Sequence, residues 1–248
     1  MNYPPLQPFP PQVAVLIDEI ESVLGKPIEI QTRNAADNPL NVPEGLALCD
    51  CRMIDGFTSV AIALPKNKKI PMHIMFHELL HAHRNVCLAV PQLKPIKDDA
   101  AGFRLAASIE NDIEHLFIIP QETSFSAESF NYWHSYYDEK LTEIANSSID
   151  NDMDILARRS NLLRLWMVTS FCLPQWNGTT QASAVLRESG YLDEANKLLH
   201  KIQLNLPSKE YCLATFLRFS KLPMDKFCLS RFLVQDRKIE HFPIPLPQ

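Results

Sequence analysis

The chain has 248 residues, of which 46% are hydrophobic and 21% are charged, and its formal net charge is −5. This length corresponds to one large domain or two small ones, and the composition excludes a disordered or collagen-like chain. The chain has no cluster of Lys and Arg, so we expect neither nucleic acid nor an anionic membrane as a partner. The most apolar segment, 162–173, is interrupted by Arg164, and we therefore expect no membrane span.

The amino-terminal segment 1–12 is rich in proline and lacks the basic and apolar regions of a secretory signal. We therefore expect a cytoplasmic protein with reduced cysteines. Cys49 and Cys51 are one residue apart on an expected strand, so their side chains point to the same face. Because no second close pair completes a four-thiolate zinc site, we interpret all six cysteines as packing residues. They are Cys49, Cys51, Cys87, Cys172, Cys212 and Cys228.

Residues 13–120 combine helix and strand patterns. We expect a helix over 13–24, strands over 27–31, 46–53 and 57–64, and helices over 72–86 and 100–119. Gly25 ends the first helix and Pro120 closes the last one. The dipeptide Asp55-Gly56 favours a hairpin turn, so the strands are expected to form a short antiparallel sheet.

Residues 121–248 show almost no strand pattern, and we expect an all-helical half. Its helices are predicted over 149–172, 181–188, 192–202, 208–219 and 224–234. Gly190 separates the second from the third, and Ser208 caps the fourth. The fold class is therefore α+β, divided into a proline-rich segment 1–12, a mixed domain 13–120 and a helical domain 121–248.

Residues 77–81 read His-Glu-Leu-Leu-His within an otherwise apolar helix. His77 and His81 are four residues apart, so both imidazoles project from one face of the helix and can bind the same zinc ion. Glu78 lies beside them and is placed to take a proton from a zinc-bound water. The alternative is a surface helix with two stray histidines, which the apolar neighbours disfavour.

A catalytic zinc ion needs a third protein ligand. Position 87 holds cysteine where a metzincin would have its third histidine, which excludes that family. On the helix over 100–119, Glu110 and Glu114 lie one turn apart on one flank. Their carboxylates would repel each other, so a cation between them and the histidines removes that cost. Burial favours Glu110 as the ligand, and Asp98 or Asp99 is the acid to consider if neither glutamate binds.

The His-Glu-x-x-His helix, followed by a helix that carries glutamates, resembles the gluzincins. The resemblance covers residues 13–120 and implies a zincin domain, a Zn²⁺ cofactor and hydrolysis of a peptide bond in a peptide or protein substrate. It implies that His77, His81 and a glutamate hold the zinc while Glu78 activates water. In that clan, an acid or amide four residues after the ligand supports a histidine, and Glu110 followed by Glu114 is similar, although Glu114 as the ligand remains an alternative. The architecture also resembles small zincin domains of cytosolic peptidases that cleave repressors.

An oxyanion donor is expected in the aromatic segment 131–137, where Tyr132, His134 and Tyr137 are candidates. The alternative is that this aromatic helix face packs the two halves together. The strand 57–64 could provide an edge for an extended substrate. The helical half is expected to select the substrate or a protein partner. The competing function is a metal-binding zincin-fold scaffold or interaction protein without turnover, which the presence of Glu78 disfavours.

Overall fold

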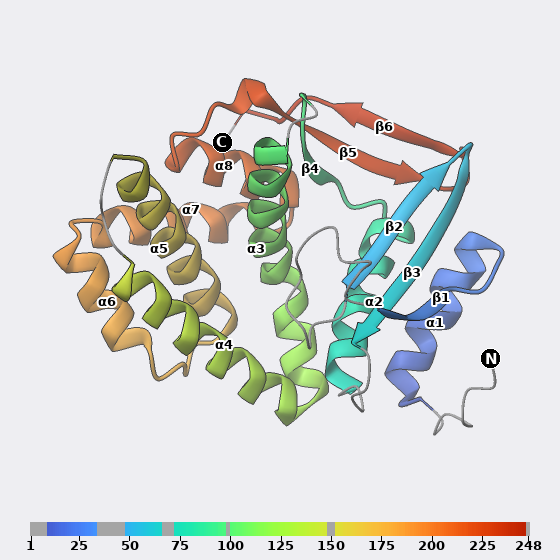
Figure 1. Cartoon of the computed structure of the whole chain (residues 1–248), viewed down its shortest axis with the longest axis horizontal. Helices are drawn as coiled ribbons and strands as arrows, with labels where there is room; N and C mark the ends of the chain where they lie inside the picture. The colour runs from blue at the N-terminus through green and yellow to red at the C-terminus, as the bar shows by residue number, and fades with distance from the viewer. Residues whose placement is uncertain (1–8, 34–47, 66–71, 98–99, 148–151, 247–248) are drawn as a thin grey trace. The chain divides into compact units, whose positions relative to one another are not determined.

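The computed structural model describes residues 9–33, 48–65, 72–97, 100–147 and 152–246. The fold is α+β and mostly helical, as expected (Figure 1). The chain divides into two compact units, Met1–Pro91 with Ser230–Glu240, and Gln92–Leu229 with His241–Gln248. The predicted domain boundary at residue 120 lies inside a helix that belongs wholly to the second unit.

The first unit contains the elements expected from the amino-terminal pattern. They are α1 Pro11–Leu24, β1 Glu29–Arg33, β2 Leu48–Ile54, β3 Phe57–Pro65 and α2 Met72–Val86. Helix α1 ends at Gly25, which adopts a left-handed φ of 67° and donates its N–H to Glu21 O. Helix α2 has the predicted bounds and packs against α1 and β2.

The sheet of the first unit has the strand order β1-β3-β2. Asp55 and Gly56 have φ values of 51° and 77° and join β2 to β3 in the predicted hairpin. The sheet is mixed, however, because β1 runs parallel to β3. The prediction of an antiparallel sheet is therefore wrong. Strand β3 lies between β1 and β2, and β1 pairs with β3, which runs in the same direction as β1. Strand β3 is paired on both sides and is not a free edge for a substrate.

The second unit is built from helices after one short strand. In chain order these elements are β4 Gln92–Pro95, α3 Ala100–Phe125, α4 Ala127–Asn146, α5 Asp152–Cys172, α6 Thr179–Glu188, α7 Leu192–Asn205 and α8 Lys209–Phe219. Gly190, with a φ of 75°, ends the turn between α6 and α7, and Ser208 caps α8 by accepting a hydrogen bond from Tyr211 N. Both features were predicted from the sequence.

Helix α3 continues through Pro120, so the prediction that this proline closes it is wrong. Proline removes one backbone donor within a helix and crowds the carbonyl of the preceding turn. Side chains bind other carbonyl groups near the proline: Gln121 donates to Phe117 O at 2.8 Å, and Thr123 donates to Ile119 O at 2.9 Å. Ile118 and Ile119 are fully buried, and their packing holds the helix together across the proline.

The predicted helix over 224–234 is also wrong, and the carboxy-terminal half is not all-helical. A short 3-10 turn at Met224–Lys226 leads into β5 Phe227–Leu233 and β6 Lys238–Phe242. Phe227 and Leu229 are buried and Cys228 between them is half-buried, which is the alternation of a strand. These strands form a sheet of order β4-β5-β6.

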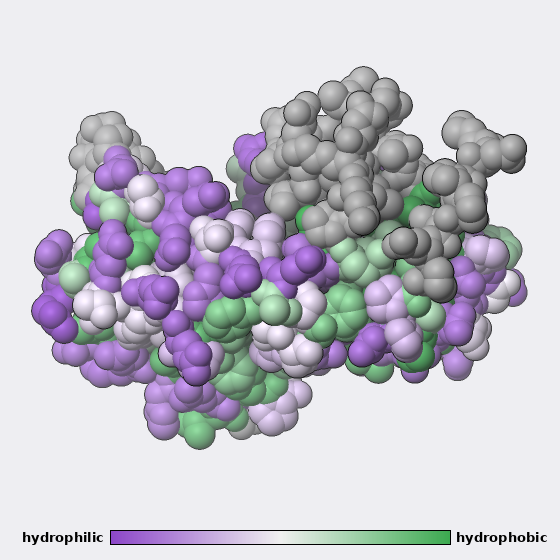
Figure 2. All heavy atoms as spheres, turned by 90° about the horizontal axis from the view of Figure 1, so that it is seen from below, coloured by the Kyte–Doolittle hydropathy of each residue, from purple (hydrophilic) through white to green (hydrophobic). Residues whose placement is uncertain are grey.

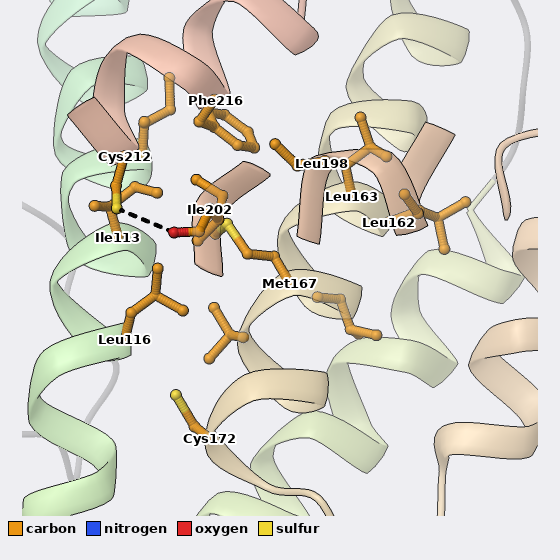
Figure 3. Packing of buried hydrophobic residues seen from close by; sticks show 14 of the residues in the cluster. Ile113, Leu116, Leu162, Leu163, Met167, Cys172, Leu198, Ile202, Cys212 and Phe216 are labelled. Atoms are coloured by element: carbon orange, nitrogen blue, oxygen red, sulfur yellow. Dashed lines mark hydrogen bonds between the residues drawn. The ribbon is translucent and has the colours of Figure 1, made fainter. Parts of the chain in front are cut away.

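The hydrophobic core of the second unit lies between α3, α5, α7 and α8 (Figure 3). Ile113 and Leu116 of α3 lie near Met167 of α5, and the thiol of Cys212 donates to Ile202 O at 3.9 Å. Many outward-facing side chains over α4 and α6 are hydrophilic (Figure 2). None of the helices that the structure describes is long and apolar enough to cross a membrane.

Candidate metal centre

Helix α2 brings His77 and His81 together. Their Nε2 atoms are 3.1 Å apart, and their ring planes meet at 83°. Two nitrogen ligands at about 2.0 to 2.1 Å from a tetrahedral zinc ion are roughly 3.3 Å from each other. The pair therefore has the separation that a shared zinc ion requires. The same distance also allows one imidazole to donate a hydrogen bond to the other when no metal is bound.

Glu78 lies in the buried part of α2, where only 8% of its surface is exposed. Its charge acts on Cys49 of β2. The pKa of that thiol is well above its ordinary value, first because of a hydrogen bond with Cys51, then burial, with the charges of Cys51, Glu78 and Asp50 adding to it. The sequence located Glu78 beside the histidines but gave no sign that it faces this strand.

The thiols of Cys49 and Cys51 are on the same side of β2, as predicted, and their Sγ atoms are 3.6 Å apart. The structure describes all six cysteines, and each is a free thiol. Only Cys172 and Cys212 are buried and the other four are half-buried, so the prediction that most of them are buried is wrong.

Beside His77 and His81, the described residues offer His115 as a third residue that could hold a metal ion. His115 is on α3, is only 3% exposed, and contacts Trp133 edge to face with ring centroids 4.8 Å apart. Sequence analysis singled out its neighbour Glu114 instead. The sequence did contain a signal for His115, because this histidine directly follows Glu114 on the same helix.

The two predicted glutamate ligands bind a lysine in the structure. Lys209 at the start of α8 forms an ion pair with Glu110, and its Nζ lies 2.6 Å from Glu114 Oε2. Glu110 Oε2 also accepts a hydrogen bond of 2.7 Å from Leu93 N. The sequence predicted a cation between these carboxylates and the histidines, whereas the cation that the structure shows beside both carboxylates is the ammonium group of Lys209.

Burial changes the pKa values of Glu110 and Lys209. The pKa of Glu110 is raised, mainly because burial disfavours its charge, although Lys209 works in the opposite direction. Burial lowers the pKa of Lys209, but the charges of Glu110 and Glu114 raise it by more, so the net shift is upward. The ammonium group is therefore charged at neutral pH.

The three oxyanion candidates lie on α4 in different surroundings. Trp133 and Tyr137 belong to the hydrophobic core, and Tyr132 packs against that core, in line with the alternative of a packing face. The ring of His134 lies 4.1 Å from that of Phe130, and burial lowers its pKa. Tyr137 lines a cavity within the second unit. Their role as oxyanion donors stays a prediction.

No known family model matches this chain, and neither curated proteins nor solved structures give a significant match. The function must therefore be argued from the chemistry of the site.

Proposed function

We propose that this protein is a zinc-dependent hydrolase that cleaves a peptide bond. The observation that carries the proposal is the 3.1 Å separation of the His77 and His81 Nε2 atoms, on a helix that also presents Glu78. Two histidines and a glutamate on one helix are the ligand pair and the base of a hydrolytic zinc site. A site that only stabilised the fold would not need the acid.

His115 is the third ligand in this proposal, in place of Glu110 or Glu114. The two carboxylates interact with Lys209, whereas His115 is a buried imidazole, a group that is a common zinc ligand. Three neutral imidazoles leave the full charge of the metal in place, whereas a carboxylate ligand would cancel part of it. The gluzincin resemblance thus extends to the motif helix but not to the third ligand.

Each residue has one task. A bound zinc ion would supply Lewis acidity, which lowers the pKa of water and polarises a carbonyl group. Glu78 accepts the proton from the attacking water and then passes it to the leaving amine. His77, His81 and His115 hold the metal through neutral nitrogens, which leaves a fourth position for water or substrate.

Metal content tests the ligand set directly. The wild type should bind about one zinc ion per chain, and His77→Ala and His115→Ala should each lose most of it. Glu110→Gln should retain zinc, because the amide preserves size and the residue is not a ligand. His200→Ala is the matched control, since His200 is exposed on α7. Loss of zinc in Glu110→Gln but not in His115→Ala would restore the gluzincin ligand set and reject ours.

Hydrolysis of a fluorogenic peptide mixture separates an enzyme from a scaffold. We expect zinc-dependent cleavage that chelation removes and added zinc restores. A protein that binds zinc through the three histidines but cleaves no peptide in the mixture would support the scaffold and contradict the hydrolase.

A further inference from the structure

Two thiols lie side by side on strand β2 of the first unit. Cys49 and Cys51 are separated by one residue, and their Sγ atoms are 3.6 Å apart. Both residues are half-buried, so each keeps part of its surface in contact with solvent. The proposed hydrolase uses neither thiol, and the pair shares no ligand with the candidate metal centre.

The pair lies on the buried face of the first sheet. The antiparallel pairing of β2 with β3 places Cys49 opposite Ile62 and Cys51 opposite Val60 (Figure 1). Residues that lie opposite each other in such a pair have side chains on the same face. Ile62 and Val60 are at most 1% exposed, so the two sulfur atoms are next to apolar side chains.

The charges that act on Cys49 are negative. The carboxylates of Glu78 on α2 and of Asp50 both help to raise the pKa of this thiol, although Asp50 is also paired with Arg52 at 2.6 Å. A carboxylate that opposes the loss of a proton does so because it disfavours a second negative charge nearby. The same potential favours a cation at the sulfur atoms.

The separation of the two sulfur atoms suits one shared metal ion. Two thiolates at about 2.3 Å from a tetrahedral ion are roughly 3.8 Å from each other, close to the observed 3.6 Å. Without an ion, the same separation lets one thiol donate a hydrogen bond to the other. A bound ion would take the place of that hydrogen bond.

A disulfide suits this geometry less well. Residues two apart in a strand have Cα atoms about 6.6 to 6.8 Å apart, which is at the upper limit of the disulfide range. A disulfide would also bring the sulfur atoms to about 2.05 Å. Strand β2 would have to contract, against its pairing with β3 at both positions. A bridging ion requires no such movement of the backbone.

We propose that Cys49 and Cys51 bind one Cu(I) ion through both sulfur atoms. Thiolates are soft ligands that select Cu(I), an ion that is stable with two of them. A zinc site has at least three protein ligands, and the described residues offer no third histidine, cysteine or acid that could join both thiols. On binding, two S–H bonds break, two Cu–S bonds form and two protons pass to the solvent. No electron is transferred, because the metal enters as Cu(I).

Competition with the chromophoric chelator bicinchoninate under anaerobic conditions measures the affinity for Cu(I). The full-length protein should carry His77→Ala, because imidazoles of the candidate metal centre can also bind copper. Loss of a group that only supports a ligand costs about 10- to 100-fold in metal affinity. Cys49→Ser and Cys51→Ser each remove a ligand, and each should weaken Cu(I) binding by at least about 100-fold. Cys87→Ser, which changes another half-buried thiol of the same unit, is the matched control and should leave binding unchanged.

X-ray absorption at the copper edge identifies the ligands without a cysteine variant, and it therefore decides the case if a serine variant fails to fold. We expect two sulfur ligands on the ion. Fewer than two sulfur ligands, equal affinity in Cys49→Ser, or failure of the protein to compete with the chelator would show that the two thiols only pack against the sheet and would overturn the proposal. These measurements need no substrate, so they are independent of the hydrolase.

Discussion

In the proposed hydrolase, turnover depends on Glu78. We expect Glu78→Gln to keep its zinc and its fold but to lose hydrolysis by at least about 100-fold, because the amide cannot accept the proton of water. Zinc content, the urea unfolding midpoint and peptide cleavage measure the three effects separately.

The control for this variant is Glu139→Gln, which changes an exposed glutamate of α4 and should leave all three measurements unchanged. If Glu78→Gln cleaved peptide at the wild-type rate, another base would be at work. If it lost its zinc, Glu78 would be a ligand.

Local spacing was sufficient to predict that His77 and His81 lie together on α2, because a helix fixes which side chains share a face. It was not sufficient for Glu110 and Glu114. The helix spacing correctly predicted that both glutamates lie on one flank of α3. Lys209, however, lies 99 residues beyond Glu110, and its contact with Glu110 depends on the packing of α8 against α3. The helix phase alone could not choose between His115 and its neighbour Glu114.

At the scale of elements, Lys209 joins α8 to α3. Its side chain is 2% exposed, and that of Glu114 is 3% exposed. We expect Lys209→Met to lower the free energy of unfolding by about 3–5 kcal/mol, since it leaves the buried Glu114 and the half-buried Glu110 without this cation. Urea denaturation measures the change, and Lys201→Met, at an exposed position on α7, is the control.

A combined variant keeps this prediction testable if Lys209→Met alone fails to fold. The triple variant Lys209→Met, Glu110→Gln and Glu114→Gln should recover most of the lost stability. It replaces all three charged side chains of the group with neutral ones, so no unpaired charge remains. Lack of recovery would mean that the lysine acts through packing and not through its charge.

The raised pKa of Glu110 also predicts that the stability of the protein depends on pH. Its pKa is raised from 4.5 in the folded protein, so folding favours the protonated form. This contribution is fully present below the unfolded value and is lost as pH rises through the raised folded value. Glu110→Gln removes the titration.

We therefore expect the stability of the wild type relative to Glu110→Gln to decrease as pH rises above about 4.5, measured by urea unfolding at a series of pH values. Asp112 has a raised pKa for the same main cause, burial, and is unchanged in both proteins. A stability difference that stayed constant across the series would contradict a raised pKa for Glu110.

Elements set by local patterns were predicted well, and elements set by distant partners were not. Helix α2, the β2-β3 hairpin, the α6–α7 turn and the α8 cap each follow from neighbouring residues. The segment 227–233 contains residues that suit either a helix or a strand, and its pairing in the sheet with β4 decided the outcome. Pro120 signals a helix end locally, but the buried residues on both sides outweigh it.

For the whole molecule, the absence of any matching family leaves the candidate metal centre as the basis of the functional proposal. A metal that binds only the folded chain must also stabilise it, because binding removes folded protein from the unfolding equilibrium. The proposed zinc site therefore links zinc binding to global stability, and unfolding can report on the site without any knowledge of the substrate.

We expect chelation to lower the unfolding midpoint of the wild type and added zinc to restore it. Above saturation of one site, each tenfold increase in free zinc should add about 1.4 kcal/mol to the free energy of unfolding. His77→Ala should show neither response, whereas His200→Ala should behave as the wild type does. A zinc-dependent stabilisation of equal size in His77→Ala would mean that the ion binds elsewhere, and a slope well above this value would mean that more than one ion binds the folded chain.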